Sequence, residues 1–62
     1  MLQKISISFF SNIDDSEEFL LKIVLFVHDN DTNKDKLIKD HISYIMNEYQ
    51  NVNKIEIDKE LI

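Results

Sequence analysis

Three segments of the chain alternate between apolar and polar residues with a period of two, and this pattern predicts three β-strands. The predicted strands span residues 2–10, 19–28 and 52–62. In the first, Ile5, Ile7 and Phe9 share one face, and the lysine and serines between them share the other. The third alternates around Ile55 and Ile57, with acidic residues opposite, which is a common protection for a sheet edge.

A fourth segment, residues 33–50, repeats apolar residues every three or four positions and predicts an amphipathic helix. Thr32, followed three positions later by Asp35, fits a variant of the capping box at the start of this helix. Asn51 is the expected stop, because asparagine tolerates left-handed backbone angles. Residues 11–18 are polar and acidic, and they predict a hairpin loop of up to eight residues.

The order of these elements predicts a single α+β domain over residues 1–62 with a ββαβ arrangement. We expect a three-stranded, mainly antiparallel sheet with one helix packed on one face. After the helix crosses the sheet, the third strand runs antiparallel to the first and pairs beside it, giving the spatial order 2-1-3. The alternative is a parallel pairing beside the second strand through a right-handed crossover.

The second predicted strand departs from the half-buried pattern because both of its faces are apolar. Strict alternation puts Leu20, Val24 and Phe26 on the face opposite the helix, with Phe10 nearby across the hairpin. One helix covers only one face, so these side chains are expected in water, beside an open strand edge. Such a surface is typical of a protein interface. The alternative is that the chain's own end, residues 61–62, folds over the patch.

The composition excludes several kinds of site. Without cysteine there is no disulfide and no cysteine-ligated zinc. Without glycine there is no P-loop, dinucleotide-binding turn or nucleophile elbow. The chain also lacks arginine, the usual bidentate ligand of phosphate and guanine. A net charge of −5 repels nucleic acid and anionic membranes and attracts basic proteins, so neither nucleic acid nor membrane is expected as a direct partner.

Two groups of residues invite a catalytic or metal-binding interpretation. Asp29, Asp31, Asn33 and Asp35 occupy alternate positions, as ligands do in a calcium loop, with Asp40 at position twelve. Lys34 stands where that loop needs glycine, so a helix-capping turn is expected instead. His28 and His41 have no ligand-spaced partners. We therefore predict no catalytic, cofactor-binding or metal-binding residues, and no enzyme activity.

The acidic residues Asp14, Asp15, Glu17 and Glu18 lie in the predicted hairpin loop. Their simplest role is to keep the loop solvated, and their alternative role is to steer a basic partner toward the protein. Mimicry of DNA is a narrower version of the second idea. It requires acidic residues spread over a whole face, and the chain's 7 lysines dilute that pattern.

The predicted function follows by exclusion. Heavy use of Lys, Asn and Ile is typical of an AT-rich genome, such as that of a low-GC bacterium, a virus or a mobile element. The first residues lack a signal-peptide core, which favours the cytoplasm, or the host cytoplasm for a viral protein. We expect a small acidic protein-binding module that inhibits or regulates another protein, such as an antitoxin or a phage-encoded inhibitor of a host enzyme or defence system. The alternative is a homodimeric structural or scaffold domain without a separate target.

The residues predicted to bind the partner fall into two groups. The apolar contact residues are Phe10, Leu20, Val24 and Phe26. The residues that steer a basic partner are Asp14, Asp15, Glu17 and Glu18.

Overall fold

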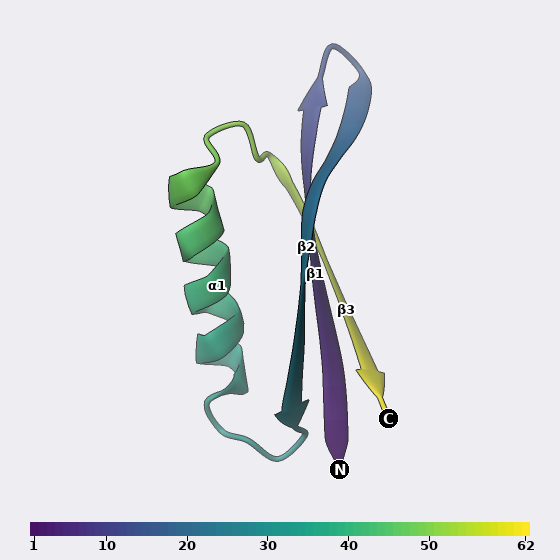
Figure 1. The fold of residues 1–62 in the computed structure, drawn as a ribbon, viewed down its shortest axis with the longest axis vertical. Helices are drawn as coiled ribbons and strands as arrows, with labels where there is room; N and C mark the ends of the chain where they lie inside the picture. Colours follow the sequence, from purple (N-terminus) through teal and green to yellow (C-terminus); the bar gives the residue numbers. More distant parts are fainter.

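The computed structural model describes all 62 residues, and its elements follow the predicted ββαβ order. They are strand β1 (Leu2–Ile13), strand β2 (Ser16–His28), helix α1 (Lys34–Glu48) and strand β3 (Lys54–Leu61). β1 lies between β2 and β3 and is antiparallel to both. The helix packs on one face of the sheet, and no second layer covers the other face (Figure 1). The predicted α+β fold and the strand order 2-1-3 are confirmed.

The β1–β2 hairpin continues almost to its tip. Ile13 pairs with Ser16, so Asp14 and Asp15 alone form the turn, with φ values of 51° and 62°. Positive φ at both central residues is what a type I′ turn requires, and aspartate tolerates it better than most residues. The prediction of a loop over residues 11–18 is therefore wrong. A strand that is solvated on both faces needs no apolar residues, so its polarity does not distinguish it from a loop.

β2 contains one extra residue opposite the Phe9–Phe10 step of β1. Phe9 pairs with Leu21 but Phe10 pairs with Phe19, which leaves Leu20 as the unpaired residue of a β-bulge. Leu20 and Leu21 both pack against the core, so the alternation of β2 reverses at this point. The prediction that Leu20 faces away from the helix is wrong, because strict alternation does not account for an inserted residue.

The core between α1 and the sheet is small. Its buried apolar side chains are Ile5, Ile7, Phe9, Val27, Ile38, Ile45 and Val52. The first three belong to β1, which is buried because it is the central strand and lies beneath the helix. Ile38 and Ile45 are seven residues apart and so lie on the same face of α1, about two turns from each other. The predicted inward faces of β1 and of the helix are confirmed at these positions.

The start of α1 differs from the predicted capping box. The N-cap residue is Asn33, whose side chain makes no capping bond. The carboxylate of Asp31 instead accepts a hydrogen bond from the backbone N–H of Asn33 at 2.8 Å. Lys34 Nζ donates to the carbonyl oxygen of Asp29, also at 2.8 Å. This local turn organises the chain ahead of the helix, so the predicted pairing of Thr32 with Asp35 is wrong.

The end of α1 needs no left-handed residue. The C-cap residue, Tyr49, has an extended backbone with φ −121° and ψ 103°, and its N–H donates to the carbonyl oxygen of Ile45. The positive-φ residues of the chain are Asp14 and Asp15, and Asn51 is not among them. The expectation of a left-handed stop at Asn51 is therefore wrong, because the extended backbone at Tyr49 already ends the helix.

The molecule is long and thin, with extents of 41 × 21 × 12 Å. Its radius of gyration is 12.8 Å, compared with about 10.6 Å for a compact domain of this length. Both chain ends lie at one end of the molecule and the hairpin turn lies at the other (Figure 1). The backbone N–H of Ile62 donates to the carbonyl oxygen of Leu2 at 3.0 Å, which holds the two ends together.

Candidate protein-binding surface

The sheet face that points away from α1, which we call the outer face, is ordered by the strand register into four rows across β2, β1 and β3. The rows are Phe26–Lys4–Glu60, Val24–Ser6–Asp58, Lys22–Ser8–Glu56 and Phe19–Phe10–Lys54. Along the strands these rows form three columns. The β2 column is mostly apolar, the β1 column has small serines at its centre, and the β3 column is mostly acidic.

Three apolar side chains of the β2 column are left in water. Phe19 is 55% exposed, Val24 41% and Phe26 57%. The predicted exposure of Val24 and Phe26 is confirmed, and residues 61–62 do not cover them. The accessible surface of the whole chain is 4589 Å², compared with about 4,200 Å² for a monomer of this mass. The chain therefore exposes more surface than a compact monomer of its mass, and these three apolar side chains contribute to it.

Phe10 lies half-buried at one end of the outer face, where it is held by two neighbours. Its ring meets that of Phe19 edge-on, with 5.7 Å between the ring centroids and 69° between the ring planes. Lys54 Nζ lies 5.4 Å from the centroid of the Phe10 ring, within the range of a cation–π contact. Phe10 thus belongs to the predicted apolar patch, and the bulge brings Phe19 to it in place of Leu20.

Lys54 connects the outer strands at this end of the sheet. Its Nζ lies 2.9 Å from Glu17 Oε2 on β2 and 3.4 Å from Glu56 Oε1 on β3. Hydrogen bonds to Glu17, and then to Glu56, raise the pKa of Lys54 above its usual value. One ammonium group therefore compensates two carboxylates here, while Asp58 and Glu60 further along β3 have no salt-bridge partner.

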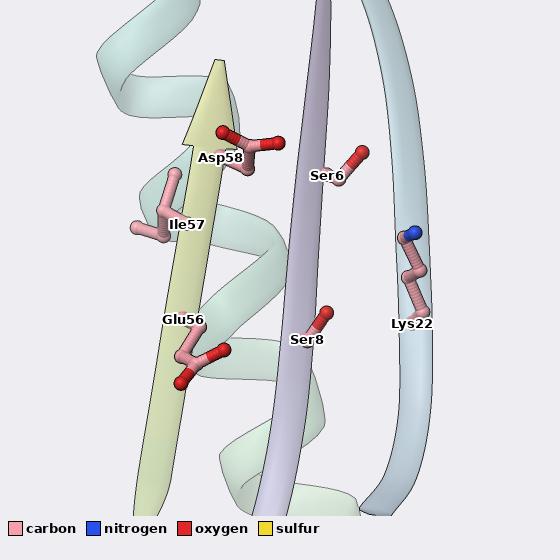
Figure 2. A pocket seen from close by; sticks show the side chains of 6 residues that line it. All are labelled: Ser6, Ser8, Lys22, Glu56, Ile57 and Asp58. Atoms are coloured by element: carbon pink, nitrogen blue, oxygen red, sulfur yellow. The ribbon is translucent and has the colours of Figure 1, made fainter.

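A shallow hollow of about 550 Å³ lies at the centre of the outer face. The residues that line it are Ser6, Ser8, Lys22, Glu56, Ile57 and Asp58. Figure 2 shows the two serines of β1 between the β2 lysine on one side and the β3 carboxylates on the other, with the helix behind the sheet. The hollow exists because serine is much smaller than the side chains of the flanking columns. Sequence reasoning did not predict any of these residues as part of a binding site.

The four acidic residues predicted to steer a partner are distributed around the hairpin tip. Asp14 and Asp15 form the turn, and Glu17 and Glu18 lie in β2 opposite β1 residues. Glu17 is bound to Lys54, so its charge is partly compensated. The other three make no salt bridge. Their role in attracting a basic partner stays a prediction.

The free edge of β2 is a second feature of this surface. β2 pairs with β1 on one side only, so alternate N–H and C=O groups along its other side have no strand partner. Between Phe19 and Val27, Lys22 is the single charged residue. The other free edge, β3, carries a charge at most of its positions, which discourages strand addition. The two edges are therefore not equally protected.

Phe19 was missed because the bulge moves it to the outer face. The signal available in the sequence was the pair of apolar runs Phe9–Phe10 and Phe19–Leu21, each of which breaks the alternation of its strand. Two such interruptions facing each other across a hairpin are typical of a bulge. The acidic column of β3 was recognised as an edge protection, and only the strand register shows that it lies two columns from Phe26 and Val24.

The remaining candidates for chemistry lie apart from the outer-face hollow. Asp29 Oδ1 lies 3.4 Å from the N-terminal ammonium group of Met1. His41 Nδ1 donates to the carbonyl oxygen of Leu37 at 2.8 Å, one turn earlier in the helix. His28 is exposed at the end of β2. Helix α1 is neither long nor apolar enough to cross a membrane.

Comparisons of this chain with protein-family models, with curated proteins and with solved structures gave no match.

Proposed function

We propose that this chain is a protein-binding module that inhibits or regulates another protein through the outer face of its sheet. The observation that carries the proposal is the exposure of Phe19, Val24 and Phe26 on a sheet whose other face is covered by α1. Aromatic side chains that bury a large area dominate the energetics of protein interfaces. Val24 and Phe26 on one side of Lys22, and Phe19 packed on Phe10 on its other side, provide such side chains.

The charge of the chain favours a basic protein as the partner. The formal net charge is −5. On the outer face Lys4, Lys22 and Lys54 balance the three carboxylates of β3, so the negative charge there is confined to the β3 column. Charges at the rim of an interface mainly raise the association rate and exclude wrong partners, while the apolar centre supplies most of the affinity. Association with the partner is therefore expected to slow as the salt concentration rises.

Self-association is a second candidate role, and the unprotected edge of β2 is the observation that favours it. Two copies of β2 that pair edge to edge would form a continuous six-stranded sheet, with the helices on one side. Such a dimer would be a structural or scaffold domain without a separate target. It would have about twice the 7.4 kDa mass of the chain.

The test combines solution mass with affinity capture. Light scattering at two concentrations separates a monomer from a dimer. Wild-type protein and the Val24→Glu and Met46→Glu variants are then used as bait in lysates. Val24 and Met46 are similarly exposed, at 41% and 43%, but they lie on the sheet and on the helix respectively. A partner that is lost with Val24→Glu and retained with Met46→Glu supports the proposal, and equal capture by both variants contradicts it.

A further inference from the structure

We propose that the outer face receives an amphipathic basic helix of the partner protein, laid along the strands over Ser6 and Ser8. This inference rests on the proposed function and specifies the chemistry of the partner. A helix in this position would complete a three-layer arrangement, with α1 on one face of the sheet and the partner's helix on the other.

The spacing of the columns fits a helix. The β2 and β3 columns are separated by two strand spacings, or about 9.6 Å. An α-helix with its side chains is about 10–12 Å wide. A helix that lies over the small serines of the β1 column is therefore wide enough to contact both flanking columns. The hollow lined by Ser6 and Ser8 lies at the middle of this path.

Ser6 lies in the lining of the hollow, between the apolar and acidic columns. Its exposed fraction is 9%, and none of the side-chain hydrogen bonds in the structure involves its hydroxyl group. The buried side-chain atoms without a partner are Gln3 Oε1 and Ser11 Oγ, so the Ser6 oxygen is accessible. It can therefore hydrogen-bond to solvent or to a polar side chain on the docked helix.

The charges on β3 match the repeat of a helix. Glu56, Asp58 and Glu60 are two residues apart on one strand, so successive carboxylates are separated by about 6.8 Å. Residues four apart on a helix are separated by about 6 Å along the axis. Lys or Arg at positions i, i+4 and i+8 would therefore face the acidic column. Apolar residues on the other flank of the helix would cover Val24 and Phe26.

A second copy of this chain fits the outer face less well. A twofold axis parallel to the strands would place the β2 column of one copy over the β3 column of the other, so that Val24 faces Asp58 and Phe26 faces Glu60. A twofold axis perpendicular to the strands and parallel to the sheet would place the two acidic columns against each other. Either arrangement buries carboxylates against apolar groups or against like charges. The columns therefore favour a partner with separate apolar and basic flanks.

The experiment selects binders for the intact protein from two phage-displayed libraries. One presents helices of about 18 residues, or roughly 27 Å, with all outward positions randomised, and the other presents extended hairpin strands. We expect enriched helices with Lys or Arg at i, i+4 and i+8 on one flank and apolar residues on the other. Enrichment of acidic or neutral helices, of strands alone, or of no helix at all would overturn the proposal.

Charge variants then locate the enriched helix on the protein. Asp58→Lys/Glu60→Lys leaves the Lys54 contacts in place, and Asp40→Lys/Glu48→Lys makes the same +4 change in formal charge on the exposed side of α1. The first pair should weaken binding about tenfold or more, and the second less than about threefold. The milder Asp58→Asn/Glu60→Gln pair should weaken it in the same direction. Equal effects of the two Lys pairs would contradict the proposed site.

A third variant separates this proposal from the proposed function. Val24→Asp should abolish binding of the enriched helices. If strands rather than helices are enriched, and Val24→Asp abolishes their binding, the outer face binds protein but not a helix. If no enriched binder of either class responds to Val24→Asp, both proposals fail.

Discussion

The side-chain amide of Asn53 pairs with the backbone of Asn12 as a neighbouring strand would. Asn53 Oδ1 accepts a hydrogen bond from the Asn12 N–H at 2.8 Å, and Asn53 Nδ2 donates to the Asn12 carbonyl oxygen at 2.9 Å. The backbone N–H of Asn53 also donates to the carbonyl oxygen of Phe10 at 3.1 Å. These three bonds join the end of the α1–β3 connection to β1 just before the strand pairs of β3 begin.

Replacing Asn53 should therefore destabilise the fold. Asn53→Ala is expected to lower the free energy of unfolding by about 1–2 kcal/mol, because both backbone groups of Asn12 lose their partner. Asn53→Asp should also destabilise, since a carboxylate cannot donate to the Asn12 carbonyl oxygen. Urea unfolding followed by circular dichroism measures both. Asn51→Ala is the control, because the Asn51 side chain makes no hydrogen bond, and a loss as large in Asn51→Ala would contradict this role for Asn53.

Replacing Asp15 in the hairpin turn by glycine should raise the free energy of unfolding. A residue with a Cβ atom at positive φ costs about 1 kcal/mol or more, and glycine does not carry this cost. Since glycine also loses more entropy on folding, the expected net gain from Asp15→Gly is about 0.5–1 kcal/mol. Thermal unfolding should show a correspondingly higher midpoint. Asp15→Ala keeps the Cβ atom and loses the local polar contacts, so a gain of the same size in that variant would count against the explanation.

Ser11 is 1% exposed, and its hydroxyl group has no hydrogen-bond partner. Removing a buried polar atom that forms no bond should stabilise the protein. Ser11→Ala is expected to raise the free energy of unfolding by about 1 kcal/mol. The matched control is Ser8→Ala on the half-buried outer face, where water can reach the hydroxyl, and little change is expected there. A destabilised Ser11→Ala variant would mean that the hydroxyl does have a partner in solution.

The pH dependence of stability should reflect Lys54. Its pKa in the folded protein is raised from 10.5 by the hydrogen bonds to Glu17 and Glu56. For a basic group with a raised pKa, the stabilisation is fully present below the unfolded pKa and is lost as pH rises through the folded pKa. Wild-type protein should therefore lose more stability than Lys54→Met between pH 9.5 and the alkaline limit of the measurement, which is about 12. If the free energy of unfolding falls with pH at the same slope in both proteins, this linkage is ruled out. The Lys22→Met variant is the control, because Lys22 forms no ion pair.

Substitutions in the core should destabilise the fold much more than substitutions on the outer face. Ile7 is fully buried in a core of only seven apolar residues, so Ile7→Ala is expected to cost about 3–4 kcal/mol and to unfold much of the protein. Phe26 is 57% exposed, and Phe26→Ala should cost less than about 1 kcal/mol. Far-ultraviolet circular dichroism and denaturant unfolding measure both effects. A large loss from Phe26→Ala in the absence of a partner would indicate that Phe26 contributes to folding itself.

The pattern of apolar and polar residues predicts the elements that bury one face. It does not predict strands whose two faces are both exposed to water. The periodicity of Ile5, Ile7 and Phe9, and the helical repeat of Ile38 and Ile45, correspond to burial against each other. Residues 12, 13 and 16–18 form strand as well, but all of them are exposed, so they need no alternation of apolar and polar side chains. Their polar composition therefore has the same appearance as that of a loop.

The candidate surface was only partly predictable for a related reason. Exposure of Val24 and Phe26 follows from having one helix for a sheet with two apolar faces. Phe19 rather than Leu20 lies on the outer face because β2 contains an inserted residue. The position of Ser6 between the apolar and acidic columns depends on strand register. Register is a long-range property, because it relates residues of β3 to residues of β1 about fifty positions earlier in the sequence.

The hydrogen bond between Ile62 and Leu2 places the beginning and the end of the chain side by side, at the end of the molecule opposite Asp14 and Asp15. The fold is therefore nearly a closed loop of backbone, and a short linker across the two ends would allow the chain to be circularly permuted with new ends at the aspartate turn. An attachment at residue 1 or at residue 62 holds the molecule at the same end. The hairpin tip is then the part that reaches farthest from whatever the chain is fused to.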